Sequence, residues 1–184
     1  MMNRWRLTLV AVVTLMLVLA CSFSLGESGN VPSASSGSGA NGGARPASSI
    51  AARVTNNIDG DTLDVEIDGR IERVRFIGID TPERGNCYYR EASDFTAALT
   101  RGQTVWLEAD PSQDDRDRYD RILRYIWLDD TRMVNALLVE GGYAFEYTYR
   151  NAYRYQASFM QLEAAARAND TGLWSPQTCN GLTE

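Results

Sequence analysis

The feature that most constrains this chain is a strand-like run, residues 74–83, that stops abruptly on charged residues. The run reads V-R-F-I-G-I-D-T-P-E, and its branched and aromatic residues favour a β-strand. Pro82 ends the strand, because proline has no N–H to donate to a sheet. The turn carries the carboxylates of Asp80 and Glu83, and Arg75 lies upstream on the same strand. Such a turn is either an acidic surface feature or a site in which one cation and two anions surround a small space.

The basic residues of the chain are unusual, because all 18 of them are arginine and there is no histidine. A Ser-His-Asp triad, a His-ligated zinc ion and a lysine Schiff base are therefore excluded. Acid–base chemistry must come from carboxylates, tyrosines or metal-bound water. The formal charge of −6 argues against a passive nucleic-acid binder, which usually presents a basic face. It is compatible with an enzyme that recruits calcium, which prefers oxygen ligands.

Residues 1–21 are predicted to be a signal peptide with a lipobox-like end. Two arginines precede an apolar run that is short for a membrane span, and the run ends in V-L-A-C. This ending resembles the lipobox of bacterial lipoproteins, in which the cysteine, here Cys21, is acylated. Leu19 departs from the small residue usually found there. An uncleaved membrane anchor is the alternative.

The rest of the chain divides into a tether and one folded domain. Residues 22–50 are rich in serine and glycine and have no hydrophobic period, so we expect a flexible linker. Residues 51–184 carry all the periodic signals and form the predicted domain. The linker is long enough to hold that domain clear of a membrane surface.

The periodic signals predict an α+β domain. We expect strands at residues 53–58, 62–67, 71–79, 103–108 and 122–128, and helices at residues 91–99, 131–140 and 153–168. Asp68-Gly69 favours a tight hairpin between the second and third strands. Thr131 is the expected N-cap of the second helix. Five short strands, with helices after the third and fifth, indicate a five-stranded OB-fold β-barrel with three helices.

Four segments and a terminal tryptophan carry a family resemblance. The segments are I-D-G-D-T at residues 58–62, the run at residues 74–83, D-R-Y-D-R at residues 117–121 and M-V-N-A-L-L-V-E-G-G at residues 133–142, followed by Trp174. In order and spacing they resemble the staphylococcal-type nucleases, the thermonuclease family, over nearly all of residues 51–175. The resemblance implies a calcium-dependent nuclease that hydrolyses DNA and RNA with little sequence preference and leaves 3′-phosphate ends.

The resemblance also implies a metal site. Asp61 and Asp80 match the family's calcium-binding carboxylates, and the backbone carbonyl of Thr81 is a further ligand. Asp59 falls where the family has a supporting carboxylate. Glu83 matches the residue usually assigned as the general base that activates water.

The remaining positions contact the substrate by the same resemblance. Arg75 and Arg121 match the two arginines that hold the phosphate and stabilise its transition state, and a guanidinium suits that role because it binds two phosphate oxygens at once. Tyr119 and Tyr147 match tyrosines that contact the nucleotide. Apart from the resemblance, the sequence places further tyrosines near the expected cleft with Tyr147, and these could form an aromatic patch: Tyr143, Tyr149, Tyr153 and Tyr155. The alternative is that most of them are packing or surface residues, since only Tyr147 belongs to a matched motif.

Two features depart from a simple match. On a regular strand Arg75 and Asp80 would point to opposite faces, so twist or the end of the strand must bring them together. Asp120 stands beside Arg121, where the family often has glycine. It either weakens the phosphate clamp or points into solvent, and we favour solvent.

Cys87 and Cys179 remain once Cys21 is assigned to the membrane end. In an exported protein a disulfide between them is favoured, with two free thiols as the alternative. In the chain-entropy model such a bridge would contribute roughly 4 kcal/mol.

The sequence thus predicts an exported bacterial lipoprotein at the cell surface or membrane, or released from it. Its predicted partners are DNA, RNA and, through the lipid anchor, the membrane; we expect a monomer with no obligate protein partner. One alternative is an inactive OB-fold surface lipoprotein that binds nucleic acid or calcium. A second is a lipoprotein of purely structural role, which would explain the tether but not the motifs.

Overall fold

The structure is a computed structural model that describes residues 43–183. The predicted signal peptide, Cys21 and most of the predicted linker lie outside the described residues. None of the helices in the described range is long and apolar enough to cross a membrane. Arg45, within the predicted linker, contacts the carboxylate of Asp130 at 2.5 Å and lies over the ring of Trp106.

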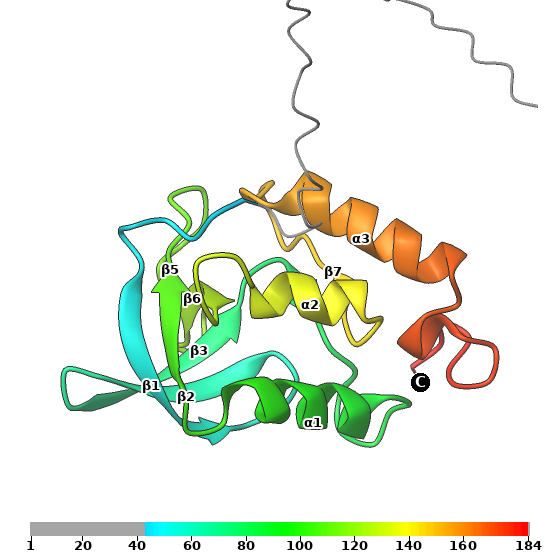
Figure 1. Ribbon diagram of the computed structural model, residues 1–184, viewed down its shortest axis with the longest axis horizontal. Helices are drawn as coiled ribbons and strands as arrows, with labels where there is room; N and C mark the ends of the chain where they lie inside the picture. The colour runs from blue at the N-terminus through cyan, green and yellow to red at the C-terminus, as the bar shows by residue number, and fades with distance from the viewer. Residues whose placement is uncertain (1–42, 184) are drawn as a thin grey trace, which may run out of the picture. The chain divides into compact units, whose positions relative to one another are not determined.

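Five strands form a closed barrel in the order β1-β2-β3-β6-β5 (Figure 1). Their bounds are β1 Ile50–Asn57, β2 Thr62–Ile67, β3 Arg70–Phe76, β5 Thr104–Glu108 and β6 Ile122–Trp127. The β3–β6 pair is parallel and the other neighbours are antiparallel. Buried side chains alternate along β2 and β3, where Leu63, Val65, Val74 and Phe76 point into the core. The predicted α+β class and five-stranded barrel are confirmed.

Three helices accompany the barrel, as predicted: α1 Tyr89–Thr100, α2 Val134–Glu140 and α3 Gln156–Ala168. The second helix contacts both of the others and also packs on β6 (Figure 1). A short 3₁₀ helix, η1, follows at Gly172–Trp174. The hairpin between β2 and β3 turns at Asp68 and Gly69, which both have positive φ, as the sequence predicted.

The third predicted strand is broken in two. β3 ends at Phe76, the chain turns at Gly78 with a φ of 79°, and the separate strand β4 (Ile79–Asp80) follows. β4 pairs with β7 (Phe145–Glu146) instead of continuing the barrel. A side chain at position 78 would overlap the ring of Tyr153, so glycine is needed there for space as well as for its backbone conformation.

The second and third helices each start three residues later than predicted. Thr131 does not cap α2, which begins at Val134. Asp129 instead accepts hydrogen bonds from the backbone N–H groups of Thr131 and Arg132, both at 2.9 Å. These bonds form a polar turn before the helix. The third helix starts at Gln156 instead of residue 153, and Tyr153 and Tyr155, which precede it, are buried in the core.

The predicted disulfide between Cys87 and Cys179 is confirmed. It joins the segment before α1 to the C-terminal tail. Beside it lies a small hydrophobic cluster, separate from the main core and formed by Ala166, Leu173, Trp174 and Cys179.

Candidate functional site

Asp61, in the turn between β1 and β2, is the best-connected residue of the predicted site. Its side chain is buried, and Oδ2 accepts hydrogen bonds from the backbone N–H of Thr81 at 2.8 Å and from the Thr81 hydroxyl at 2.9 Å. Oδ1 accepts a hydrogen bond from the Thr62 hydroxyl at 3.1 Å. Because Thr81 directly follows β4, these bonds fix the β1–β2 turn against the end of β4.

Gly60 allows this close approach. A Cβ atom at residue 60 would lie 2.8 Å from the side chain of Thr81, closer than side-chain atoms normally come. The carbonyl of Gly60 also accepts the hydroxyl of Thr96 on α1 at 2.7 Å. The D-G-D segment therefore needs its glycine for space, because the turn is packed between Thr81 and α1.

Arg75, near the end of β3, connects the two predicted metal-binding carboxylates. Its Nη1 forms an ion pair with Asp61, and its Nη2 lies 2.5 Å from Oδ1 of Asp80. The break at Gly78 makes this geometry possible, because the chain folds back so that Asp80 faces Arg75. The sequence predicted that either twist or the end of the strand must bring the two together, and the structure shows that it is the end of the strand.

Negative charge exceeds positive charge around these contacts. Burial, together with the charge of Asp61, raises the pKa of Asp59 from 3.8 to about 6, while its Oδ1 accepts the backbone N–H of Asp61 at 3.1 Å. Burial also raises the pKa of Asp80; the charge of Arg75 opposes this, and the charges of Asp61 and Glu83 add to it. One guanidinium therefore serves several carboxylates, and an additional cation would be favourable here.

The oxygen atoms at this site are of the kind that bind calcium. Ca²⁺ takes carboxylate and backbone carbonyl oxygens and completes its coordination with water. The carboxylates of Asp61 and Asp80 contact the same guanidinium, so they lie close together, and Thr81 is adjacent in the chain. Within residues 43–183 no group of three or more His, Cys, Asp or Glu side chains is arranged to hold a metal ion. The candidate site therefore rests on two carboxylates with backbone and water oxygens.

Glu83 lies in the exposed loop that follows Pro82. Within the described residues, its side chain makes no hydrogen bond or ion pair. Its charge reaches Asp80, and its carbonyl accepts the backbone N–H of Asn86 at 2.9 Å. This is an accessible carboxylate beside the Asp61–Arg75–Asp80 cluster.

Arg121 is held by Asp117, a residue that the sequence analysis quoted in a motif but did not assign. Oδ2 of Asp117 lies 2.7 Å from Nε and 2.6 Å from Nη2 of Arg121, and Oδ1 accepts the Arg121 backbone N–H at 3.0 Å. Although burial opposes it, hydrogen bonds from Arg121 hold the pKa of Asp117 below its ordinary value. The signal was the spacing of four within D-R-Y-D-R, which lets one carboxylate bind both backbone and side chain of the arginine.

Strand pairing places Arg121 near Arg75 without joining them. Val74 pairs with Ile122 and Arg75 with Leu123, so Arg121 lies one residue before β6 on the side of the sheet that carries Arg75. In the described part of the chain no hydrogen bond or ion pair joins Arg121 to Asp61, Arg75 or Asp80. Contacts thus link four residues of the predicted site: Asp61, Thr81, Arg75 and Asp80. Arg121 stands apart from them, one residue before the neighbouring strand β6.

Asp120 lies in solvent, as expected. Its side chain is 88% exposed, and the nearest cation is Arg116 at 3.5 Å. Its φ of 64° is the left-handed conformation that glycine adopts most readily and aspartate tolerates. Backbone geometry at this position would therefore also suit the glycine expected from the resemblance.

The predicted tyrosine patch is only partly a surface. Tyr119 is exposed, with the Arg121 guanidinium 5.4 Å from its ring centre. Tyr147 and Tyr149 are exposed and neighbouring, with ring centres 6.4 Å apart. For Tyr153 and Tyr155 the packing alternative holds, because both are buried and their rings pack with Tyr125 and Phe159 in the core. Tyr143 is half-buried and stacks on Phe95.

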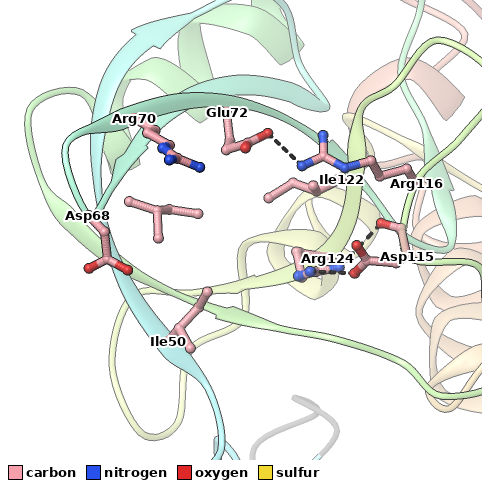
Figure 2. A pocket seen from close by; sticks show the side chains of 9 residues that line it. Ile50, Asp68, Arg70, Glu72, Asp115, Arg116, Ile122 and Arg124 are labelled. Atoms are coloured by element: carbon pink, nitrogen blue, oxygen red, sulfur yellow. Dashed lines mark hydrogen bonds and ion pairs between the residues drawn. The ribbon is translucent and has the colours of Figure 1, made fainter.

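A hollow of about 410 Å³ is lined in part by Arg70 and Glu72 of β3 and by Ile122 and Arg124 of β6 (Figure 2). Figure 2 shows that most of its charged side chains pair with one another: Arg116 binds Glu72 at 2.9 Å, and Arg124 binds Asp115 at 2.6 Å. Its lining contains none of the predicted site residues.

A family model described as staphylococcal nuclease homologue matches residues 73–176, a range that includes Arg75, Asp80, Glu83 and Arg121 but begins after Asp61. The thermonuclease of Staphylococcus hyicus is 37% identical over 173 residues, covering 91% of this chain and 95% of the relative. The thermonuclease of Staphylococcus intermedius is 37% identical over 123 residues, 64% of this chain and 71% of its own.

An uncharacterized endonuclease of Escherichia coli is 34% identical over 126 residues, 68% of this chain and 78% of its own. The family model covers more than half of the chain, and the barrel agrees with the fold predicted from the motifs. The chain belongs to the staphylococcal nuclease family.

Proposed function

We propose that this protein is a calcium-dependent nuclease that hydrolyses phosphodiester bonds in DNA and RNA with little sequence preference and leaves 3′-phosphate ends. Membership of the staphylococcal nuclease family and the named thermonuclease and endonuclease relatives support phosphodiester hydrolysis. The observation that carries the proposal is the cluster in which Arg75 contacts both Asp61 and Asp80. It brings a phosphate-binding cation and two metal-binding carboxylates into one place.

In this proposal Asp61, Asp80 and the carbonyl of Thr81 hold the calcium ion. When bound, the ion offsets negative charge that develops on the phosphoryl oxygens. The excess of carboxylates over guanidinium groups supports cation binding. Because Asp61 and Asp80 both bind Arg75, a cation on these carboxylates competes with it and leaves its N–H groups for a phosphate.

The two arginines bind and orient the phosphate. The side chains of Arg75 and Arg121 are 14% and 26% exposed, so each is partly open to solvent while ion pairs with carboxylates hold its guanidinium. Asp117 holds Arg121 through its backbone and its guanidinium, which reduces the freedom that the arginine would lose on binding.

Glu83 is the proposed general base. It is exposed, and it lies close enough to Asp80 for its charge to raise the pKa of that residue. A carboxylate is a weak base, so its usefulness depends on its position next to the attacking water. Glu83 would accept the proton from that water at a carboxylate oxygen.

Exposed tyrosines are the proposed contacts to bases. The rings of Tyr119 and Tyr147 are accessible, and base–aromatic stacking contributes about 1–3 kcal/mol for each real contact while tolerating any base. This tolerance is consistent with low sequence preference.

We also propose that the protein is exported and tethered by a lipid on Cys21, with residues 22–50 as linker and residues 51–184 as a monomeric nuclease domain. The Cys87–Cys179 disulfide supports an oxidising compartment, because such bonds rarely persist in the cytosol. Labelling with a lipid precursor, compared with a Cys21→Ala variant, tests the anchor: label on the wild type alone is expected, and equal label on both contradicts it.

Digestion of plasmid DNA and of RNA tests the activity. With calcium, wild-type protein should degrade both, and EGTA should stop it. Glu83→Gln and Arg121→Ala should each lose about 10²- to 10³-fold in rate. Arg53→Ala is the matched control, because Arg53 is an exposed arginine on β1. Binding of nucleic acid or calcium without hydrolysis would favour the inactive surface protein instead.

A further inference from the structure

The C-terminal segment, residues 172–183, is attached to the loop that carries Glu83. Cys179 in this segment forms the disulfide with Cys87, which lies four residues after Glu83. The backbone N–H of Cys87 also donates to the carbonyl of Thr183 at 3.2 Å. The segment therefore holds the downstream end of the loop through one covalent bond and one hydrogen bond.

The same segment also contacts the strand that supports Asp80. Trp174 packs edge-to-face on Phe145, with ring centres 5.0 Å apart. Phe145 is the β-sheet partner of Asp80 in the β4–β7 pair. The C-terminal segment thus reaches both the proposed metal-binding strand and the loop of the proposed general base.

The loop has few restraints of its own between its two ends. At the upstream end Thr81 is held by two hydrogen bonds to Asp61. At the downstream end Cys87 is held by the C-terminal segment. Between them, backbone hydrogen bonds link Asn86 to Glu83 and Tyr89 to Asn86, and the Arg84 guanidinium lies over the ring of Tyr89. The Glu83 side chain has no hydrogen bond or ion pair among residues 43–183. The position of Glu83 consequently depends on both ends of the loop.

Opening the disulfide would not expose the main core. The buried residues beside it, Ala166, Leu173 and Trp174, form a cluster of their own, and the barrel core is assembled from other residues. Loss of the bond should therefore loosen the C-terminal segment and the loop before it loosens the barrel.

We propose that the Cys87–Cys179 disulfide is a positioning device for Glu83 that makes the nuclease active in an oxidising environment and much less active in a reducing one. This inference rests on the proposed function. A dithiol such as dithiothreitol supplies two electrons and two protons, so that the disulfide becomes two thiols and the dithiol becomes a cyclic disulfide. The freed loop no longer holds the Glu83 carboxylate in place. The proposed phosphate-binding arginines, Arg75 and Arg121, keep their positions.

Steady-state kinetics with and without dithiothreitol test the device. For the wild type, reduction should lower kcat about 10- to 100-fold, as expected when a reacting group is misplaced by about 1 Å, and should change KM much less. Reoxidation should restore kcat. The Cys87→Ser/Cys179→Ser double variant should have the low kcat already and should not respond to dithiothreitol.

A control variant separates positioning from stability. Val54→Ala removes buried side-chain volume from β1, in the barrel wall far in sequence from the loop. It should lower the melting temperature, as the double serine variant does, but keep the wild-type kcat at low temperature and its response to dithiothreitol. An equal loss of kcat in Val54→Ala would overturn the proposal, because general destabilisation would then explain the effect.

Hydrogen–deuterium exchange gives a readout that needs no activity. Reduction should increase exchange in residues 81–88 and in the C-terminal segment and leave β1, β2 and β3 protected. Unchanged exchange in residues 81–88, or an unchanged kcat on reduction of an active enzyme, would overturn the inference. If the oxidised wild type shows no nuclease activity, the proposed function fails, and exchange alone then decides whether the disulfide positions the loop.

Discussion

Two carboxylate centres in this protein differ in how their charge is compensated. Glu108, at the end of β5, is 2% exposed and accepts hydrogen bonds from Trp127 Nε1 at 2.7 Å, from the Tyr155 hydroxyl at 3.0 Å and from Arg154 at 2.5 Å. One carboxylate thus has one cation and two neutral donors. At Asp61 and Asp80, two carboxylates share the single guanidinium of Arg75.

The difference separates a structural centre from the proposed functional one. The Glu108 centre joins β5 and β6 to the segment before α3, and its donors satisfy the carboxylate, so it has no need of a further ligand. Burial and the charge of Glu108 raise the pKa of Tyr155 to about 12, which keeps the hydroxyl protonated as a donor. The Asp61–Asp80 centre retains surplus negative charge, and this surplus is what would bind a cation.

The comparison predicts opposite outcomes for removing one charge from each centre. Asp80→Asn should reduce kcat about 10²- to 10³-fold, because a proposed calcium ligand is lost. In calcium-free buffer the same variant should unfold at a temperature no lower than the wild type, because it removes unbalanced negative charge. Plasmid digestion and thermal unfolding measure the two effects. Glu66→Gln, an exposed carboxylate on β2, is the control and should change neither.

Glu108→Gln should instead destabilise the fold. The amide cannot accept all three hydrogen bonds, and the charge of Arg154 is left without its partner, so we expect a loss of about 3 kcal/mol in the free energy of unfolding. The kcat at low temperature should stay within about twofold of wild type, since Glu108 makes no contact with the proposed site. Urea unfolding measures the loss of stability. A loss of less than about 1 kcal/mol in the free energy of unfolding would show that the Glu108 centre is not the structural centre described here.

Asp117→Asn sharpens the comparison. Like Glu108, Asp117 has hydrogen-bond donors and a cation that compensate its charge, but that cation is Arg121, a proposed substrate-binding residue. Without its charge, Arg121 would be oriented less firmly, and we expect kcat/KM to fall about tenfold, comparable to the loss of one charge-assisted hydrogen bond. Asp117→Glu should recover part of the activity. A variant with full activity would mean that Arg121 needs no support from Asp117.

Asp59 gives the smallest effect, a pH dependence of stability. Its pKa is raised in the folded state to about 6, so the folded protein holds this proton more tightly than the unfolded chain does. The stabilising contribution is therefore present below the unfolded pKa of about 4 and is lost as the pH rises toward 6. In calcium-free buffer, thermal unfolding of wild type relative to Asp59→Asn should show this decline between those values. Parallel profiles for the two proteins would contradict it.

Local signals predicted the barrel because its strands alternate and its hairpin turn is encoded in two adjacent residues, Asp68 and Gly69. The break of the third strand was harder to predict, since it depends on Tyr153, which is distant in sequence and fills the space above Gly78. The start of α2 was misplaced because Thr131 is a good N-cap by type, yet its hydroxyl donates to Oδ1 of Asp129 at 3.0 Å and the helix begins only at Val134.

The site was predictable where a motif carries it and hidden where contacts are long-range. The pairing of Asp61 with Thr81 lies within the reach of motif analysis, since both residues belong to matched segments. Nothing local indicates that Glu108 will meet Arg154, because only the folded chain brings them together. The role of Asp117 falls between these cases, since its spacing to Arg121 is visible in the sequence but its contacts are not.

Calcium binding measured by isothermal titration calorimetry tests the central claim most directly. The wild type should bind one calcium ion, and Asp80→Asn should lose that binding while Glu108→Gln keeps it. Wild-type protein that binds no calcium, or Asp80→Asn that binds it as tightly as the wild type, would contradict the assignment of the Asp61–Arg75–Asp80 cluster as the metal centre.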